Sequence, residues 1–234
     1  MPGKNVIKTY IENGFYHVYN RGVEKRLIFL DEQDHRVFLS YLNLYLLPKV
    51  DSINKIKSYF NLTEDDKNNR IAHLLLLNNF YKKIEVLSYI LKPNHLHLEI
   101  KQVEKNSMEI FMQSLITKYV KYFNRKYQRV GPLFQGRYKA ILIDKKEYLL
   151  HLCRYIHLNA QEELEKGQNL VDYPWSSYPV YIKGNGPKWL NKEYILSYFK
   201  QTKGFSFSSY EGFIEGYKEK SEEESDLYRR LLLD

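Results

Sequence analysis

Two histidines stand one residue apart in the segment LKPNHLHLEI, residues 91–100. If this segment is a β-strand, alternate side chains share a face, so His95 and His97 point the same way. Two imidazoles on one face can bind a single divalent metal ion, because imidazole is a common ligand of borderline cations. A His-x-His pair is also a short pattern that arises by accident, and a third ligand must come from another element. Glu99 shares the histidine face and is expected to face the solvent.

The segment KKEYLLHLCRYIHLNAQ, residues 145–161, supplies candidates for the remaining chemistry. It predicts an amphipathic helix. The apolar stripe expected to seat this helix on the core comprises Leu149, Leu152 and Ile156. Tyr155 and Asn159 are four residues apart and therefore lie together on a neighbouring stripe. Asn159 offers an amide oxygen as a ligand, and the Tyr155 phenol becomes a nucleophile once deprotonated. A tyrosine beside a core stripe is also an ordinary packing residue, so the pattern alone leaves both roles open.

Several further residues are candidate contacts for the phosphate groups of DNA. On the first predicted strand and its turn they are His17, Asn20 and Arg21. The segment FQGRYKA contributes Gly136, Arg137 and Lys139. One side of a long predicted helix carries Lys118, Lys121 and Arg125. Glycine at 136 would let a ligand approach the backbone closely. A packed histidine at 17 and a solvated basic helix face are the ordinary alternatives.

The order of the predicted elements indicates the fold. Strands are expected at 14–22, 83–91, 95–102 and within 131–144, and helices at 31–47, 106–127 and 145–161. These expectations rest on alternating and helical spacing of apolar residues. The order β-α-β-β-α-β, followed by one more helix, fits an α+β fold with a ferredoxin-like split βαβ core. Its antiparallel sheet would carry helices on one face and leave the other open for a ligand. Residues 48–80 are interpreted as an inserted helical segment.

The composition favours an anionic partner. The chain has 234 residues, 44% of them hydrophobic, and its 36 Lys and Arg against 28 Asp and Glu give a formal net charge of +8. This length suits one buried core with an appendage, and the charge favours nucleic acid first. Cys153 is the only cysteine, so no intramolecular disulfide forms and a reducing compartment is expected. Without a signal-peptide pattern or a run of about 20 apolar residues, a cytoplasmic protein without membrane contact is expected.

A series of separated motifs occurs in one order along the chain. They are YHVYNRG, KPNHLHLEI, a basic amphipathic helix, GPLFQGRYKAILID, YLLHLCRYIHLNA and DYPWSSY. Together, over about residues 10–183, they resemble the single-tyrosine HUH transposases, most closely the REP-associated tyrosine transposases (RAYT) and their relatives. The resemblance implies a transposase or nuclease domain at residues 1–183 and leaves residues 184–234 as a helical C-terminal extension.

The resemblance also implies a chemistry. His95 and His97 correspond to metal ligands, Asn159 to a third ligand and Tyr155 to the catalytic tyrosine, with Mg²⁺ or Mn²⁺ as cofactor. The implied activity is cleavage and rejoining of single-stranded DNA through a 5′-phosphotyrosine intermediate. Hairpin ends or repetitive palindromic sequences are the implied partners, bound by a monomer or a homodimer. The long segment 48–80, and NAQ where many relatives have NPV, depart from the family pattern and leave substrate details open.

Two other functions fit parts of the sequence. A non-cleaving protein with this fold would bind single-stranded DNA or RNA through aromatic and basic residues. Such a protein has no reason to keep His95, His97, Tyr155 and Asn159 together. A metal hydrolase would activate water at the His-x-His site, but it needs a further ligand cluster and a general base, and none stands out. Convergence of the four residues in space therefore discriminates between the functions.

Overall fold

The computed structural model of the protein describes residues 10–200 and 209–216. Its centre is a four-stranded antiparallel sheet in the order β2-β3-β1-β4. The strands are β1 (Gly14–Arg21), β2 (Ile84–Lys92), β3 (His95–Gln102) and β4 (Lys139–Ile143). Each predicted strand is confirmed, although the last one is confined to the end of the segment 131–144. The strand order is that of a ferredoxin-like split βαβ core, as predicted.

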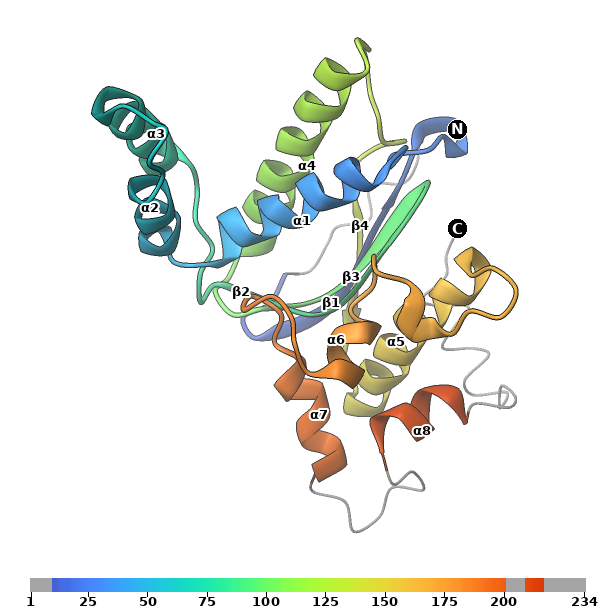
Figure 1. The fold of residues 1–234 in the computed structure, drawn as a ribbon. Helices are drawn as coiled ribbons and strands as arrows, with labels where there is room; N and C mark the ends of the chain where they lie inside the picture. The colour runs from blue at the N-terminus through green and yellow to red at the C-terminus, as the bar shows by residue number, and fades with distance from the viewer. Residues whose placement is uncertain (1–9, 201–208, 217–234) are drawn as a thin grey trace.

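Helices α1 (Glu32–Leu46) and α4 (Ser107–Lys126) cover one face of this sheet (Figure 1). The side chain of Asp31 caps α1 by accepting a hydrogen bond from the backbone N–H of Asp34. α4 buries an apolar stripe along its length, from Met108 through Leu115 to Tyr119. Leu96, Leu98 and Ile100 of β3 are fully buried, as expected for side chains that alternate with the histidines.

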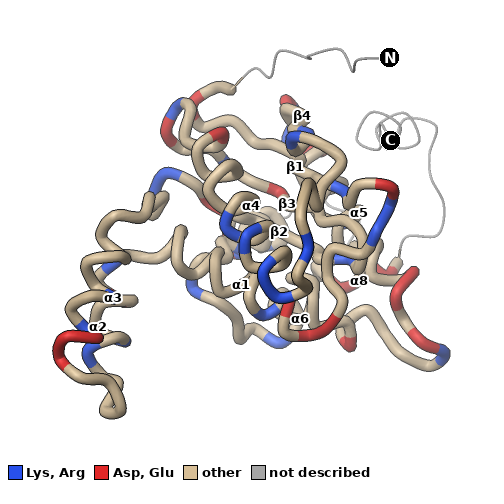
Figure 2. The backbone as a smooth tube through the Cα atoms, turned by 90° about the horizontal axis from the view of Figure 1, so that it is seen from above, with Lys and Arg blue, Asp and Glu red and all other residues tan. Residues whose placement is uncertain are grey.

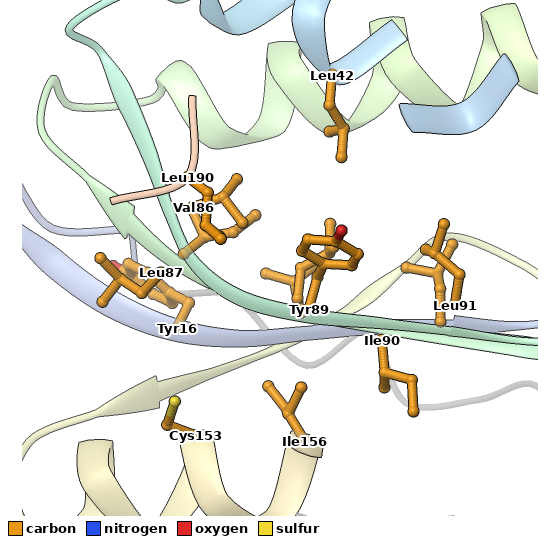
Figure 3. Close-up of a cluster of buried hydrophobic side chains, with 14 of the residues drawn as sticks. Tyr16, Leu42, Val86, Leu87, Tyr89, Ile90, Leu91, Cys153, Ile156 and Leu190 are labelled. Atoms are coloured by element: carbon orange, nitrogen blue, oxygen red, sulfur yellow. The ribbon is translucent and has the colours of Figure 1, made fainter. Parts of the chain in front are cut away.

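The opposite face of the sheet is covered as well, which corrects the expectation that it is open. Helix α5 (Lys146–Leu158) packs on this face and buries its predicted stripe of Leu149, Leu152 and Ile156. Figure 3 shows Leu42 of α1 on one side of the strands and Ile156 of α5 on the other. A helix with an apolar stripe must bury it, and the sheet face is the available surface.

The C-terminal part of the chain packs on the same side as α5 (Figure 1). It contributes α6 (Tyr178–Lys183), α7 (Lys192–Lys200) and α8 (Tyr210–Glu215). Isolated bridges join Ser176 and Leu190 to the outer edge of β2. Ile195 and Ile214 are buried in the common core, so these helices extend it. The charged end of the expected extension, from residue 217, lies outside the described residues.

The expected inserted segment forms a helical hairpin that projects from the body (Figures 1 and 2). It consists of α2 (Lys49–Lys57) and α3 (Glu64–Leu76). At its base the Asn79 amide donates to the carbonyl oxygen of Leu47 over 2.8 Å. Phe60 at the tip is fully exposed, so the hairpin adds little to the core. In the part of the chain that the structure describes, the helices are all too short or too polar to cross a membrane.

A buried carboxylate ties α1 to the end of α4. Asp34 is 0% exposed and accepts hydrogen bonds from Tyr122 at 2.9 Å and Lys126 at 2.8 Å. Its second oxygen accepts from the Leu30 backbone N–H and the Tyr127 hydroxyl, each at 2.8 Å. Burial raises the pKa of Asp34, but the bonds from Lys126 and the other donors outweigh it, so the pKa is lowered overall. The ionised form is therefore the one that the fold stabilises.

We expect Asp34→Asn to destabilise the fold by about 2 kcal/mol at neutral pH, because charge-assisted hydrogen bonds are lost. An aspartate whose pKa is lowered in the folded state contributes its full stabilisation at pH values above its ordinary pKa of about 4. This stabilisation is lost as the pH falls through the folded-state pKa. Urea unfolding of the wild type and of Asp34→Asn is measured from neutral to acid pH. The difference between their free energies of unfolding should become smaller at low pH. Glu32→Gln, which removes only an exposed i,i+4 pair with Arg36, is the control and should cost under about 0.5 kcal/mol.

Candidate active site

The sheet register places the two histidines at the start of β3, on the face that α5 covers. His95 is paired with Arg21 of β1 and Lys92 of β2. His97 is paired with Tyr19 of β1 and Ile90 of β2. Paired residues of an antiparallel sheet project to the same side, so basic and aromatic side chains from neighbouring strands surround the histidines.

The histidine rings lie with centroids 5.0 Å apart and planes at 85°. His95 Nδ1 lies 2.5 Å from the side-chain oxygen of Asn94, and His97 Nδ1 lies 2.8 Å from Nε2 of His17. These contacts occupy the Nδ1 atom of each ring. Nε2 of His97 is buried and makes no hydrogen bond with any described residue. A buried imidazole nitrogen in this condition is suited to a metal ion, and the Nδ1 contacts orient the rings as ligand-supporting bonds do.

His97 is held in its neutral form. Burial lowers its pKa well below the usual range, and the positive charges that His17, His95 and Lys92 can carry lower it further. The neutral imidazole is the form that binds a metal. Across residues 10–200 and 209–216, three or more His, Cys, Asp or Glu side chains do not gather in one place to hold a metal. A divalent ion at the histidine pair would therefore need further ligands of another kind, such as amide oxygens.

Tyr155 projects from α5 toward the histidines. Its ring lies edge-on to His97 with centroids 5.7 Å apart, and edge-on to His17 at 6.1 Å. Tyr155 is half-buried, whereas its neighbours Arg154 and Ile156 are buried. The expected proximity of this tyrosine to the histidines is thus present in the fold.

Asn159 ends α5 and begins η2 (Asn159–Glu163), a 3₁₀ helix, so the predicted helix stops three residues early. Its side-chain N–H donates to the carbonyl oxygen of Tyr155 over 2.8 Å. Its amide oxygen makes no hydrogen bond within the described ranges, and amide oxygens suit hard divalent cations. Glu162 and Glu163 of η2 bind Lys92, which is paired with His95, so η2 lies at the His95 end of the site.

Lys92 is a site residue that the sequence analysis missed. Its side chain is 3% exposed, and its ammonium group pairs with Glu162 and, at 3.3 Å, with Glu163. This ion pair joins the strand next to His95 to the turn that carries Asn159. One sequence feature could have identified it: Lys92 is a charged residue that directly follows the apolar run VLSYIL and precedes the Pro-Asn turn.

The expected phosphate contacts of β1 divide into two groups. Arg21 is half-buried beside His95, on the face of the site. His17 and Asn20 are buried, which argues against their expected contact with DNA. His17 instead bonds His97, and Asn20 donates to the carbonyl oxygen of Gly136 over 3.3 Å. Gly136 is exposed and open, and an added Cβ there would meet nothing within 4 Å.

The other basic candidates lie in two places. Arg137 is exposed in the loop before β4, and the Lys139 ammonium lies 5.2 Å from the ring centroid of Tyr19. Tyr19 in turn stacks on His97 at 5.8 Å, so Lys139 borders the site. The remaining candidates are on α4, across the sheet from the histidines (Figure 1). These are Lys118, Lys121 and Arg125.

Glu99 is buried, which corrects the expectation that it faces the solvent. α5 covers its strand face, and the Ser88 hydroxyl donates to one carboxyl oxygen over 2.6 Å. Burial raises the pKa of Glu99 to about 8, and the bond from Ser88 only partly offsets this rise. Burial therefore favours the uncharged form of this carboxyl group.

A buried polar cluster holds the other side of α5, and the sequence analysis missed it. His157 lies 2.6 Å from the Ser177 hydroxyl through Nε2 and 2.6 Å from the Tyr210 hydroxyl through Nδ1. Cys153 Sγ lies 3.1 Å from the same Tyr210 hydroxyl. Burial lowers the pKa of His157 to about 3, so this histidine is neutral. Its partners come from α6 and α8, too far along the chain for a local pattern to reveal.

The Lys92 pair should respond asymmetrically to mutation. Glu162→Gln/Glu163→Gln leaves a buried ammonium group uncompensated and should cost about 3 kcal/mol. Lys92→Met keeps the length of the side chain and leaves carboxylates that can reach water, so it should change stability by less than about 1 kcal/mol. Urea unfolding measures both. Equal costs for the two variants would show that the ammonium is not buried in the way described.

Comparisons with known proteins find similarity to transposases. Residues 51–159 match the family model described as "Transposase IS200 like". Comparison with curated proteins gives no match. Among solved structures, the chain is similar to one described as the REP-associated tyrosine transposase bound to a REP hairpin. That similarity has 16% identity and a TM-score of 0.42, and it covers 77% of this chain and 86% of the other. The family match spans both histidines, Tyr155 and Asn159, so this part of the chain is similar to the IS200-like transposases, as its motifs indicated.

Proposed function

We propose that the protein cleaves and rejoins single-stranded DNA, with Tyr155 as the nucleophile and a Mg²⁺ or Mn²⁺ ion held by His95, His97 and Asn159. The substrate class is hairpin ends or repetitive palindromic DNA. The observation that carries this proposal is the position of Tyr155, whose ring lies 5.7 Å from that of His97 although the two residues come from different elements. A protein that only binds DNA gains nothing from this juxtaposition.

The reaction is an exchange of phosphoester bonds. The Tyr155 oxygen forms a bond to the scissile phosphorus, and the bond from phosphorus to the 3′-oxygen breaks. The leaving 3′-oxygen takes up a proton, which gives a free 3′-OH and a 5′-phosphotyrosine link. Attack on this link by another 3′-OH restores a phosphodiester and the tyrosine, so rejoining needs no external energy source.

The surroundings of Tyr155 favour this chemistry. A free tyrosine has a pKa of about 10, so the phenolate needs positive charge nearby at neutral pH. Arg21 and Lys139 place positive charge on the face that Tyr155 covers. When bound, a divalent cation would neutralise and orient the scissile phosphate. Arg21, Arg137 and Lys139 line the side of the site toward β4 and would hold neighbouring phosphates.

The role of Tyr155 is tested by a covalent adduct assay. Labelled single-stranded hairpin oligonucleotides are incubated with Mn²⁺ or Mg²⁺ and run on a denaturing gel. We expect a metal-dependent protein–DNA adduct that falls at least about a thousandfold in Tyr155→Phe, since the nucleophile is gone. Tyr148→Phe, at another half-buried tyrosine of α5, should leave the adduct unchanged. Cleavage that survives Tyr155→Phe would favour the hydrolase, and tight binding without any adduct would favour the binding protein.

The contact between His17 and His97 predicts a separate effect on the metal. His17→Phe keeps a buried ring but removes the partner of His97 Nδ1. Loss of such a supporting bond lowers metal affinity by roughly 10- to 100-fold. We expect the Mn²⁺ concentration for half-maximal adduct formation to rise by that factor, with the yield restored at high Mn²⁺. A loss that no Mn²⁺ concentration restores would mean that His17 does not act through the metal ligand.

A further inference from the structure

A groove runs between α1 and α4 on the outer side of the helix layer. It has a volume of about 610 Å³ and is lined by Tyr41 of α1 and by Lys118, Lys121, Tyr122, Arg125 and Lys126 of α4. The sheet lies between this groove and the helix that carries Tyr155 (Figure 1). A single segment of a long ligand therefore cannot contact the groove and the histidine site at the same time.

The charge in the groove is incompletely balanced. Lys126 pairs with Asp31 and Asp34, whereas Lys118, Lys121 and Arg125 make no ion pair with any residue that the structure describes. Burial lowers the pKa of Lys118, and the neighbouring charge of Lys121 lowers it further. Like charges that crowd a half-buried lysine are costly, and an anionic ligand would relieve this repulsion.

Aromatic rings accompany the cations. Tyr41 is half-buried, and the Lys118 ammonium lies 5.3 Å from its ring centroid. Tyr122 is fixed by its hydroxyl, which donates to Asp34 over 2.9 Å. Cations beside partly exposed aromatic rings form the kind of surface that binds unpaired nucleic acid, with phosphates on the cations and bases on the rings.

The spacing of the cations suits a nucleic acid strand. Lys118, Lys121 and Arg125 lie at positions i, i+3 and i+7, which span about 10 Å along a helix. That length matches about three nucleotides at the stacked rise of roughly 3.4 Å. Figure 2 looks onto the face of the molecule that carries α1 and α4 and marks the basic positions of α4.

We propose that this groove is a second DNA site, which binds an unpaired stretch of the strand outside the point of cleavage. The inference rests on the proposed function, because DNA is taken as the polyanion. The two sites would then hold one strand on opposite sides of the sheet, with the chemistry confined to the histidine face.

The test measures binding without cleavage. Tyr155→Phe protein in EDTA is titrated with labelled single-stranded oligonucleotides at several salt concentrations, and anisotropy reports the affinity. The variant Lys118→Gln/Lys121→Gln/Arg125→Gln should lower the slope of log affinity against log salt by about 2, since each lost phosphate contact on a single strand contributes about 0.7. Tyr41→Leu should weaken binding roughly tenfold and leave this slope unchanged, because it removes a stacking partner and no charge.

The matched control is Lys55→Gln/Lys57→Gln/Arg70→Gln, which removes the same charge from exposed positions on α2 and α3. Equal affinities and slopes for the two triple variants would overturn the proposal. An equal loss of duplex and single-strand binding, with no effect of Tyr41→Leu, would overturn the assignment to an unpaired strand. Adduct formation by both triple variants with Tyr155 restored is measured separately, at saturating oligonucleotide. Absence of an adduct in both would count against the cleavage activity and not against the groove.

Discussion

The packing of α5 against the histidine-bearing face of the sheet is the constraint on which the site depends. Each buried aliphatic side chain of its stripe, Leu149, Leu152 and Ile156, contributes about 1.5–3 kcal/mol through removal from water. This burial sets the height and rotation of the helix, and with them the position of Tyr155 over His97. The register of β1 against β3 is equally restrictive, because a slip of one residue would turn His17 and Tyr19 to the other face.

Burial of this face requires that its polar groups find partners inside the protein. An unsatisfied buried polar group costs about 1–3 kcal/mol, so the hydrogen bonds here decide which arrangement is stable. Ser88 satisfies one oxygen of Glu99, and Ser177 and Tyr210 satisfy both nitrogens of His157. Nε2 of His97 and the second carboxyl oxygen of Glu99 are buried on this face and make no hydrogen bond with any described residue. Burial raises the pKa of Glu99 and favours its uncharged form, whereas the neutral ring of His97 keeps a nitrogen that is suited to a ligand.

Local periodicity was sufficient to predict the strands, the main helices and the shared face of His95 and His97. It predicted the helix that carries Tyr155, but the pattern alone left the role of this tyrosine open, and the resemblance of the motifs to a known family singled it out. Periodicity tells which side chains share a face, but it does not tell what covers that face. The burial of Glu99 was therefore not foreseen, and the burial of His17 was only one of two alternatives. Lys92 was missed for the same reason, because its carboxylate partners lie about 70 residues away and only folding brings them together.

The helix that carries Tyr155 is enclosed on its far side by residues that come much later in the chain. Tyr210 bonds both His157 and Cys153, and Arg154 stacks on Phe213 with the guanidinium carbon 4.5 Å from the ring centroid. Synthesis proceeds from the N-terminus, so the sheet and α5 emerge from the ribosome before α8 exists. During that interval α5 rests on the sheet alone, with its second polar cluster unformed. The order of translation thus keeps the tyrosine helix incompletely anchored until α8 has been made.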